Sequence, residues 1–252
     1  MATNETMNRV AKTTTIRGEK LMNTNLIRWA GLSAMLAGIC YVLVGLFHPP
    51  NIASSVTTPQ WAIVHAMAIA MSFFGLLGMT GIHARQVKES GRLGLAGYLL
   101  FSLWLVVITG FTFVEALILP LLATTSPAFV NGWMATLNGS AIGMDLGALP
   151  TVWTLTAPVY MLGGLLFGIA TIRAGILPRW AAVLLAAGTA LAPVAALLPL
   201  DLQPKMAVPV GLALAGLGYA LVSERRVQAS EEQVAQPVSG KGSPQLSQTA
   251  IR

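Results

Sequence analysis

Long apolar stretches separated by short polar breaks dominate the pattern of the chain. A helix needs about 20 mostly apolar residues to cross a bilayer, and six stretches come close to that length. They cover residues 27–47, 61–83, 94–121, 151–172, 180–200 and 206–222. Prolines inside the later stretches are compatible with membrane helices, because neighbouring helices can satisfy the freed carbonyls. The pattern predicts an all-α fold, a polytopic membrane bundle of six transmembrane helices.

Polar segments flank this expected transmembrane domain, which we place at residues 27–223. Residues 1–26 form a polar N-terminal tail, and residues 224–252 are rich in Gln, Ser, Glu and Pro. We expect the C-terminal tail to be disordered. The first apolar stretch is too long for a typical signal peptide and has no small-residue cleavage pattern, so we expect a retained helix. Met22 begins a second plausible product, which leaves the start at Met1 or Met22 open.

The basic residues fall almost entirely on one side of the expected bundle. With six spans, 14 of the 15 lysines and arginines share a side, and only Lys205 lies on the other. Cytoplasmic loops carry this excess of positive charge in membrane proteins. The bias predicts a multi-pass protein of the cell inner membrane with both termini in the cytoplasm. Tryptophans agree, because Trp29 and Trp180 fall at inner ends of spans and Trp61 and Trp153 at outer ends, where indoles prefer the interface.

Composition supports the lipid bilayer as the main partner. The chain is 55% hydrophobic and 10% charged, whereas soluble domains carry about a quarter charged residues. The net charge of +6 does not predict nucleic-acid binding, because the basic residues cluster between apolar stretches without interleaved aromatics. The single cysteine, Cys40, offers no internal disulfide and no CxxC pair. Whether the protein forms a homo-oligomer or has a membrane partner stays open.

One acidic residue interrupts the third stretch, in the sequence GFTFVEALILP at residues 110–120. Glu115 is costly inside a membrane helix, and such residues usually face the bundle and mark a functional site. Ser102, Thr109 and Thr112 precede it at spacings that place them on the same helix face. We therefore expect Glu115 to face the bundle interior near the outer end.

Two histidines are expected at a similar depth. His65 begins the second span and His48 ends the first, so both lie at the outer side with Glu115. We expect Glu115 to meet His65, with His48 or the loop 123–150 closing the site. This loop is apolar enough (PAFVNGWMATL) to predict a short helix over the end of the bundle. Asp145 and Tyr160 are further candidates for the same site.

Several functions remain open at this stage. The cluster could bind a small ligand, an ion or a proton, or His48, His65 and Glu115 could hold a divalent metal or haem. A membrane-embedded metal-dependent hydrolase would need such a metal, but no HExxH-like spacing supports it. An accessory protein without chemistry is an equally good alternative, and it predicts that these side chains lie far apart and that an exposed apolar groove receives a partner. Motifs of soluble enzymes are absent, so catalytic residues and cofactors stay unassigned.

Several short motifs resemble a broad group of bacterial membrane proteins. They are GLFHPP, GIHARQ followed by GRLGLAGYLL, FVEALILP and FGIATIRAGILPRWAAVLL. Over roughly residues 30–222, the chain resembles an uncharacterised family of bacterial six-span integral membrane proteins. The resemblance implies an all-helical membrane domain without an assigned activity. It also implies that His48, Glu115 and the turn at residues 177–180 belong to a shared pattern.

Overall fold

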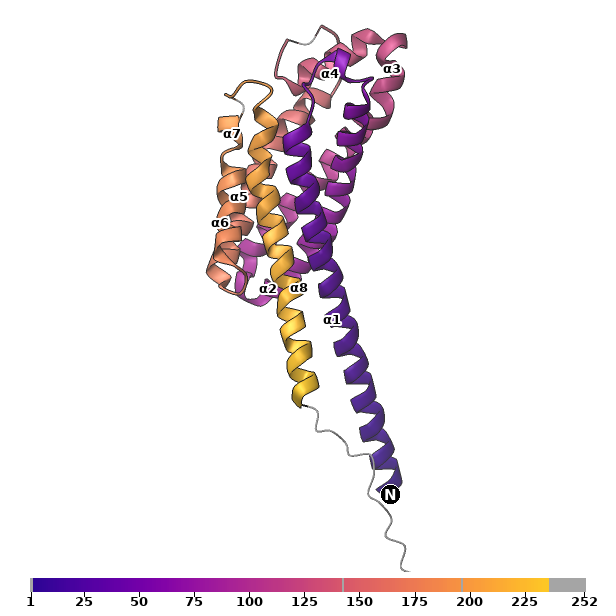
Figure 1. The fold of residues 1–252 in the computed structure, drawn as a ribbon, viewed down its shortest axis with the longest axis vertical. Helices are drawn as coiled ribbons and strands as arrows, with labels where there is room; N and C mark the ends of the chain where they lie inside the picture. Colours follow the sequence, from indigo (N-terminus) through magenta and orange to yellow (C-terminus); the bar gives the residue numbers. More distant parts are fainter. Residues whose placement is uncertain (1, 142, 196, 236–252) are drawn as a thin grey trace, which may run out of the picture.

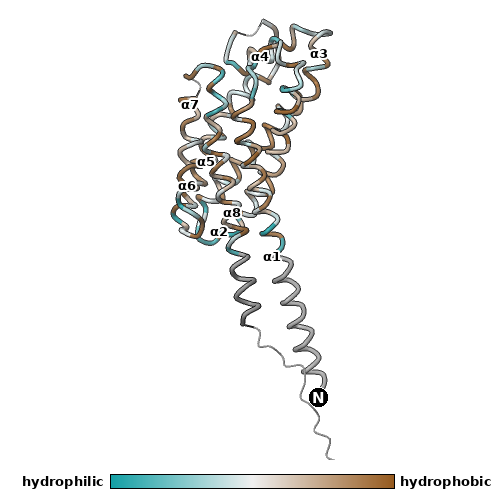
Figure 2. Tube along the Cα trace, viewed as in Figure 1, coloured by the Kyte–Doolittle hydropathy of each residue, from teal (hydrophilic) through white to brown (hydrophobic). Residues whose placement is uncertain are grey.

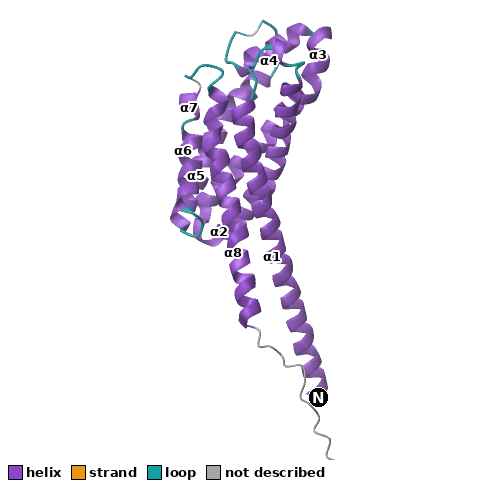
Figure 3. Ribbon diagram, in the orientation of Figure 1, coloured by secondary structure: helices purple, strands orange, loops and turns teal. Residues whose placement is uncertain are grey.

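A computed structural model describes residues 2–141, 143–195 and 197–235, which contain helices and no strands (Figure 3). The prediction of an all-α fold is confirmed for these residues. The elements are α1 (Ala2–Phe47), a 3₁₀ turn η1 (Ala53–Ser55), α2 (Pro59–Phe113), a π turn η2 (Val114–Ile118), α3 (Leu119–Thr125), α4 (Pro127–Leu137), α5 (Leu149–Ala174), α6 (Arg179–Ala190), α7 (Ala192–Ala195), a 3₁₀ turn η3 (Gln203–Ala207) and α8 (Val208–Ala235).

The long element α2 is a hairpin of two antiparallel arms. Gly91 breaks it with φ 55° and ψ −151°, a conformation that L side chains rarely adopt. Nothing lies within 4 Å of where its Cβ would be, so the backbone conformation, not crowding, favours glycine there. The first arm covers residues 59–90 and the second 92–113. Their contact is direct, because the hydroxyl of Thr80 lies 3.0 Å from that of Tyr98.

Helices α1 and α5 pack against this hairpin, and α8 packs against α1 and α6 (Figure 1). Helix α1 contacts both α8 and α2, whereas α5 contacts α2 and α6. Small residues allow close approach: a Cβ on Gly38 of α1 would collide with the backbone of Gly211 of α8, and the reverse holds too. Such packing of small residues is typical of helices in membranes, where apolar burial from water cannot drive association.

Among the residues that the structure describes, four helical segments are long and apolar enough to cross a membrane. They are Asn25–Phe47, Pro59–Thr125, Leu149–Ala174 and Gln203–Glu224, and the second contains both arms of the hairpin. Hydrophobic residues run along the bundle, whereas hydrophilic residues gather near its two ends (Figure 2). Large apolar side chains such as Leu121 and Leu103 are exposed on the outside. These features indicate a membrane-embedded protein, because lipid can cover apolar side chains that water could not.

Two parts of the chain differ from the sequence-based boundaries. The stretch 180–200 is not one helix: α6 ends at Ala190 and α7 is a single short turn. Pro193 and Pro199 explain this, because proline cannot donate to the helix ladder and its ring clashes with the preceding turn. The tails also contain helix, since α1 begins at Ala2 and α8 continues to Ala235. Residues 236–252, part of the expected disordered tail, lie outside the described residues.

The expected helix in the loop 123–150 is present as α4. Helices α3 and α4 lie at the far end of the bundle from the N-terminus (Figure 1). Val130, Trp133 and Met134 of α4 are buried in a cluster with Phe111 and Leu119. The loop therefore covers this end of the hairpin with apolar side chains.

Candidate functional site

Glu115 lies in the π turn at the end of the hairpin, and Pro120 explains that turn. In a regular α-helix, the N–H of Leu119 would bond to the carbonyl of Glu115. Here it bonds to the carbonyl of Val114 instead. The next donor along the chain would be residue 120, but Pro120 has no N–H. The carbonyl oxygen of Glu115 is thus freed from its own helix, as is common at π turns in functional sites.

Trp61 satisfies this freed carbonyl from the other arm. Its indole N–H donates to the Glu115 carbonyl oxygen at 2.7 Å. The Trp61 side chain is completely buried between the elements of the bundle, and its depth at the membrane interface stays a prediction. The cause of this burial is the hairpin itself, which places the start of the first arm beside the end of the second. The sequence does contain one sign of this contact: Pro120, five residues after Glu115, has no N–H to donate to the Glu115 carbonyl, which therefore needs another donor.

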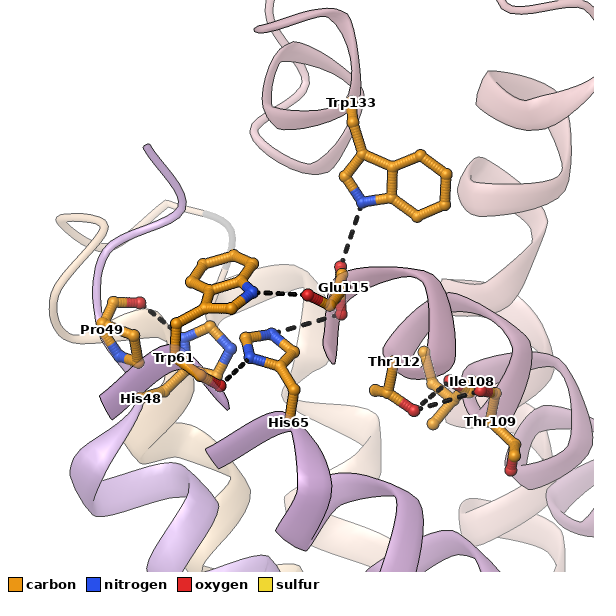
Figure 4. Close-up of polar contacts among 9 residues, drawn as sticks. All are labelled: His48, Pro49, Trp61, His65, Ile108, Thr109, Thr112, Glu115 and Trp133. Carbon is orange, nitrogen blue, oxygen red and sulfur yellow. Dashed lines mark hydrogen bonds and ion pairs between the residues drawn. The ribbon is translucent and has the colours of Figure 1, made fainter. Parts of the chain in front are cut away.

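The side chain of Glu115 meets His65, as expected from their similar depth (Figure 4). His65 Nε2 lies 3.3 Å from Glu115 Oε2, and both residues are buried. The other ring nitrogen, His65 Nδ1, lies 2.8 Å from the carbonyl oxygen of Trp61. A carbonyl can only accept, so Nδ1 must carry a hydrogen. The Trp61 ring also stacks on the His65 ring, with centroids 4.0 Å apart.

Trp133 of α4 completes the polar contacts of the carboxyl group. Its indole N–H donates to Glu115 Oε1 at 3.2 Å, and its side chain is buried (Figure 4). This bond connects the covering helix α4 to the hairpin. Trp133 was not among the sequence-derived site residues, because its position within an apolar loop gave no sign of its partner.

His48 lies at the edge of the pair. Its ring centroid is 5.1 Å from that of His65 in an edge-on arrangement, and its Nδ1 donates to the carbonyl of Pro49 at 2.7 Å. Burial lowers the pKa of His48 below its ordinary value of 6.5, and the proximity of His65 adds to this. The bond to Pro49 and the charge of Glu115 oppose the shift in pKa. His48 thus tends to be the neutral neighbour of the pair.

The structure separates the remaining candidates from this cluster. Tyr160 bonds to the Tyr41 hydroxyl at 3.2 Å and packs on Trp104, which precedes Glu115 by three turns of helix. Asp145 is exposed and accepts from the N–H of Gly147 at 2.7 Å. Thr112 is buried one turn from Glu115, but its hydroxyl donates to carbonyls of its own helix. Of the polar stripe, Thr109 and Thr112 donate to carbonyls of their own helix, whereas the Ser102 hydroxyl has no protein partner among the described residues.

The hydrogen-bonding roles of the two side chains determine how many protons the Glu115–His65 pair carries. With Nδ1 protonated, a carboxylate facing an unprotonated Nε2 would place two acceptors against each other. One further proton removes this conflict, either on Nε2 or on the carboxyl group. Each partner of the pair also contacts a tryptophan: Trp133 donates to one oxygen of the carboxyl group, and the Trp61 ring stacks on the imidazole. Among the described residues, no three His, Cys, Asp or Glu side chains are arranged to hold a metal ion.

Comparisons with known proteins give no relative: no family model, curated protein or solved structure matches this chain.

Proposed function

We propose that this chain is a multi-pass membrane protein that binds a proton at the Glu115–His65 pair, near the outer face of the cell inner membrane. The observation that carries the proposal is the 3.3 Å contact between His65 Nε2 and Glu115 Oε2, with Nδ1 committed to a carbonyl. Intramembrane acids paired with histidine are the groups that proton-coupled membrane proteins use. The polar contacts described above leave room for one labile proton between two buried groups.

The proposed topology has six passes with both termini in the cytoplasm. The two arms of α2 supply two passes, α1, α5 and α8 supply one each, and α6 with α7 supplies the last, shorter one. The excess of basic residues supports the orientation, because the turn at Gly91 carries Arg85, Lys88 and Arg92. Family membership among bacterial six-span proteins stays a prediction from sequence motifs.

Cysteine labelling tests the topology. Cys40 is buried and can be replaced by alanine to give a cysteine-free chain. We expect Ala141→Cys to react with an impermeant reagent added outside intact cells, and Val87→Cys to react only after the cells are opened. Both positions are exposed in the fold. Labelling with the opposite preference would overturn the orientation.

Infrared titration tests proton binding. As the pH is changed, the carboxyl and imidazole bands of the protein reconstituted in lipid should change together, because both groups belong to one coupled pair. This joint change should disappear in Glu115→Gln. Glu89→Gln is the matched control, because Glu89 is an exposed acid on the same hairpin. We expect this control to keep the coupled band. Equal spectra for wild type and Glu115→Gln across the titration would contradict the proposal.

A further inference from the structure

A second group of buried polar side chains lies about 30 Å from His65 along the first arm of α2, taking the rise of a helix. His83, Gln86 and Ser90 follow each other at spacings of three and four, which places them on one helix face. Their exposed fractions are 8%, 0% and 7%. Gln86 faces α5, where it bonds to Thr171, and the Ser90 hydroxyl lies against Gly94 of the second arm.

The orientation of the Gln86 amide is fixed by its neighbour. Gln86 Nε2 lies 2.7 Å from the hydroxyl oxygen of Thr171. That hydroxyl already donates its hydrogen to the carbonyl of Phe167 at 2.9 Å. In this arrangement it accepts from Gln86, and turning the amide over would require the Thr171 hydroxyl to give up its bond to Phe167. Gln86 Oε1 is left buried and without a protein donor.

Two more atoms of this face lack protein partners. They are the Ser90 hydroxyl oxygen and His83 Nδ1. The His83 ring lies flat against Tyr98, with centroids 4.7 Å apart and planes within 4°, and the Phe167 ring lies 6.4 Å away. Buried polar atoms are nearly always hydrogen-bonded to protein or to ordered water. Three such atoms on successive turns of one helix face therefore require a common explanation.

We propose that His83, Gln86 and Ser90 form a water-binding site between the hairpin and α5. Gln86 Oε1 is an acceptor and needs a donor, whereas the Ser90 hydroxyl and His83 Nδ1 can each donate or accept. Water supplies both roles and is neutral, which matches three uncharged partners. A metal cation would find only two oxygens among the three atoms, and an anion would face the lone pairs of Gln86 Oε1. Water here would connect the three turns of the arm by hydrogen bonds.

X-ray radiolytic footprinting in ¹⁸O-labelled water tests this site, because hydroxyl radicals form at bound water and oxidise the side chains beside it. We expect His83 and Tyr98 to incorporate ¹⁸O, although His83 is buried. The incorporation should be slow, because the bound water exchanges slowly with the labelled bulk water. Gln86→Leu combined with Ser90→Ala should reduce this oxidation several-fold. Thr109→Val is the matched control, because the Thr109 hydroxyl is already bonded to the carbonyl of Leu105, and it should leave the oxidation of His83 unchanged.

Unchanged oxidation of His83 and Tyr98 in the double variant would overturn the proposal, as would no oxidation of these residues in the wild type. If the double variant fails to fold, the wild-type protein still decides the question. A structure determined at a resolution that shows ordered water should contain a density peak within about 3 Å of Gln86 Oε1. A well-ordered Gln86 side chain without such a peak would equally rule out the site.

Discussion

The indole N–H of Trp61 donates to the main-chain carbonyl oxygen of Glu115 at 2.7 Å, across 54 residues and from the opposite arm of the hairpin. This bond places the carboxyl group of Glu115 beside His65, which lies one turn after Trp61 on the same arm. It also stabilises the π turn, since the carbonyl has no donor in its own helix. Backbone and side chain of Glu115 are thus held by the same turn of the first arm.

Trp61→Phe should remove the donor and leave a buried carbonyl without a partner. We expect a loss of about 1–3 kcal/mol in the free energy of unfolding, the usual cost of an unsatisfied buried acceptor. Denaturant titration of the purified protein in mild detergent measures this. Trp180→Phe is the control, because Trp180 is 56% exposed, and it should have a much smaller effect. Equal stability of Trp61→Phe and wild type would show that the bond contributes nothing.

Glu115 and His65 should be energetically coupled. In a double-mutant cycle with Glu115→Gln and His65→Gln, we expect a coupling energy of about 0.5–3 kcal/mol, typical of contacting residues in one network. The physical reason is that either single change leaves a buried polar group facing a partner of the wrong kind. Unfolding of the four proteins under identical conditions gives the value. Strict additivity of the two changes would speak against a direct interaction.

Helix α4 should depend on Trp133 for its attachment. Trp133→Phe keeps the apolar ring and removes the bond to Glu115 Oε1, so we expect faster hydrogen exchange of the α4 backbone, Pro127–Leu137. Trp153→Phe serves as the control, because Trp153 packs on Phe111 with centroids 5.0 Å apart and belongs to α5. Its effect on α4 should be smaller. If both variants leave α4 equally protected, apolar packing alone holds this helix in place.

The pKa of His48 gives a prediction for pH. Because this pKa is lowered in the folded protein, the unfolded chain binds more protons below about pH 6.5. Stability should therefore fall as the pH decreases through the unfolded pKa toward the folded one. His48→Gln cannot titrate, so its stability should fall less between about pH 8 and about pH 5. Unfolding measured at several pH values tests the sign, and a steeper fall in the variant would contradict it.

Helix positions were well predicted wherever apolar runs were uninterrupted. The expected span 151–172 corresponds to α5, Leu149–Ala174, and the first ends at Phe47 as predicted. The fifth was misjudged because hydropathy does not register that Pro193 ends a helix. The tail beyond residue 223 was expected to be disordered, yet α8 runs to Ala235, because its Glu, Arg, Gln and Ala residues have high helix propensity.

The expected depth along the membrane predicted the pairing of His65 with Glu115, but not which residues surround that pair. His65 and Glu115 were paired because both were expected near the outer ends of their spans, and relative depth follows from counting residues. The burial of Trp61 was not foreseen, because it depends on the rotation of the first arm about its axis. Tyr160 was grouped with the site although it lies deeper, beside Tyr41. Rotation and exact depth are set by packing, which hydropathy does not encode.

The protonation state of His65 tests the central claim most directly. The chain has three histidines, so ¹⁵N-histidine labelling gives a nuclear magnetic resonance spectrum with few signals, and His48→Gln and His83→Gln assign two of them. At neutral pH we expect both ring nitrogens of His65 to be protonated in the wild type, and a neutral ring in Glu115→Gln. A neutral His65 in the wild type, with a spectrum that Glu115→Gln does not change, would contradict the shared proton.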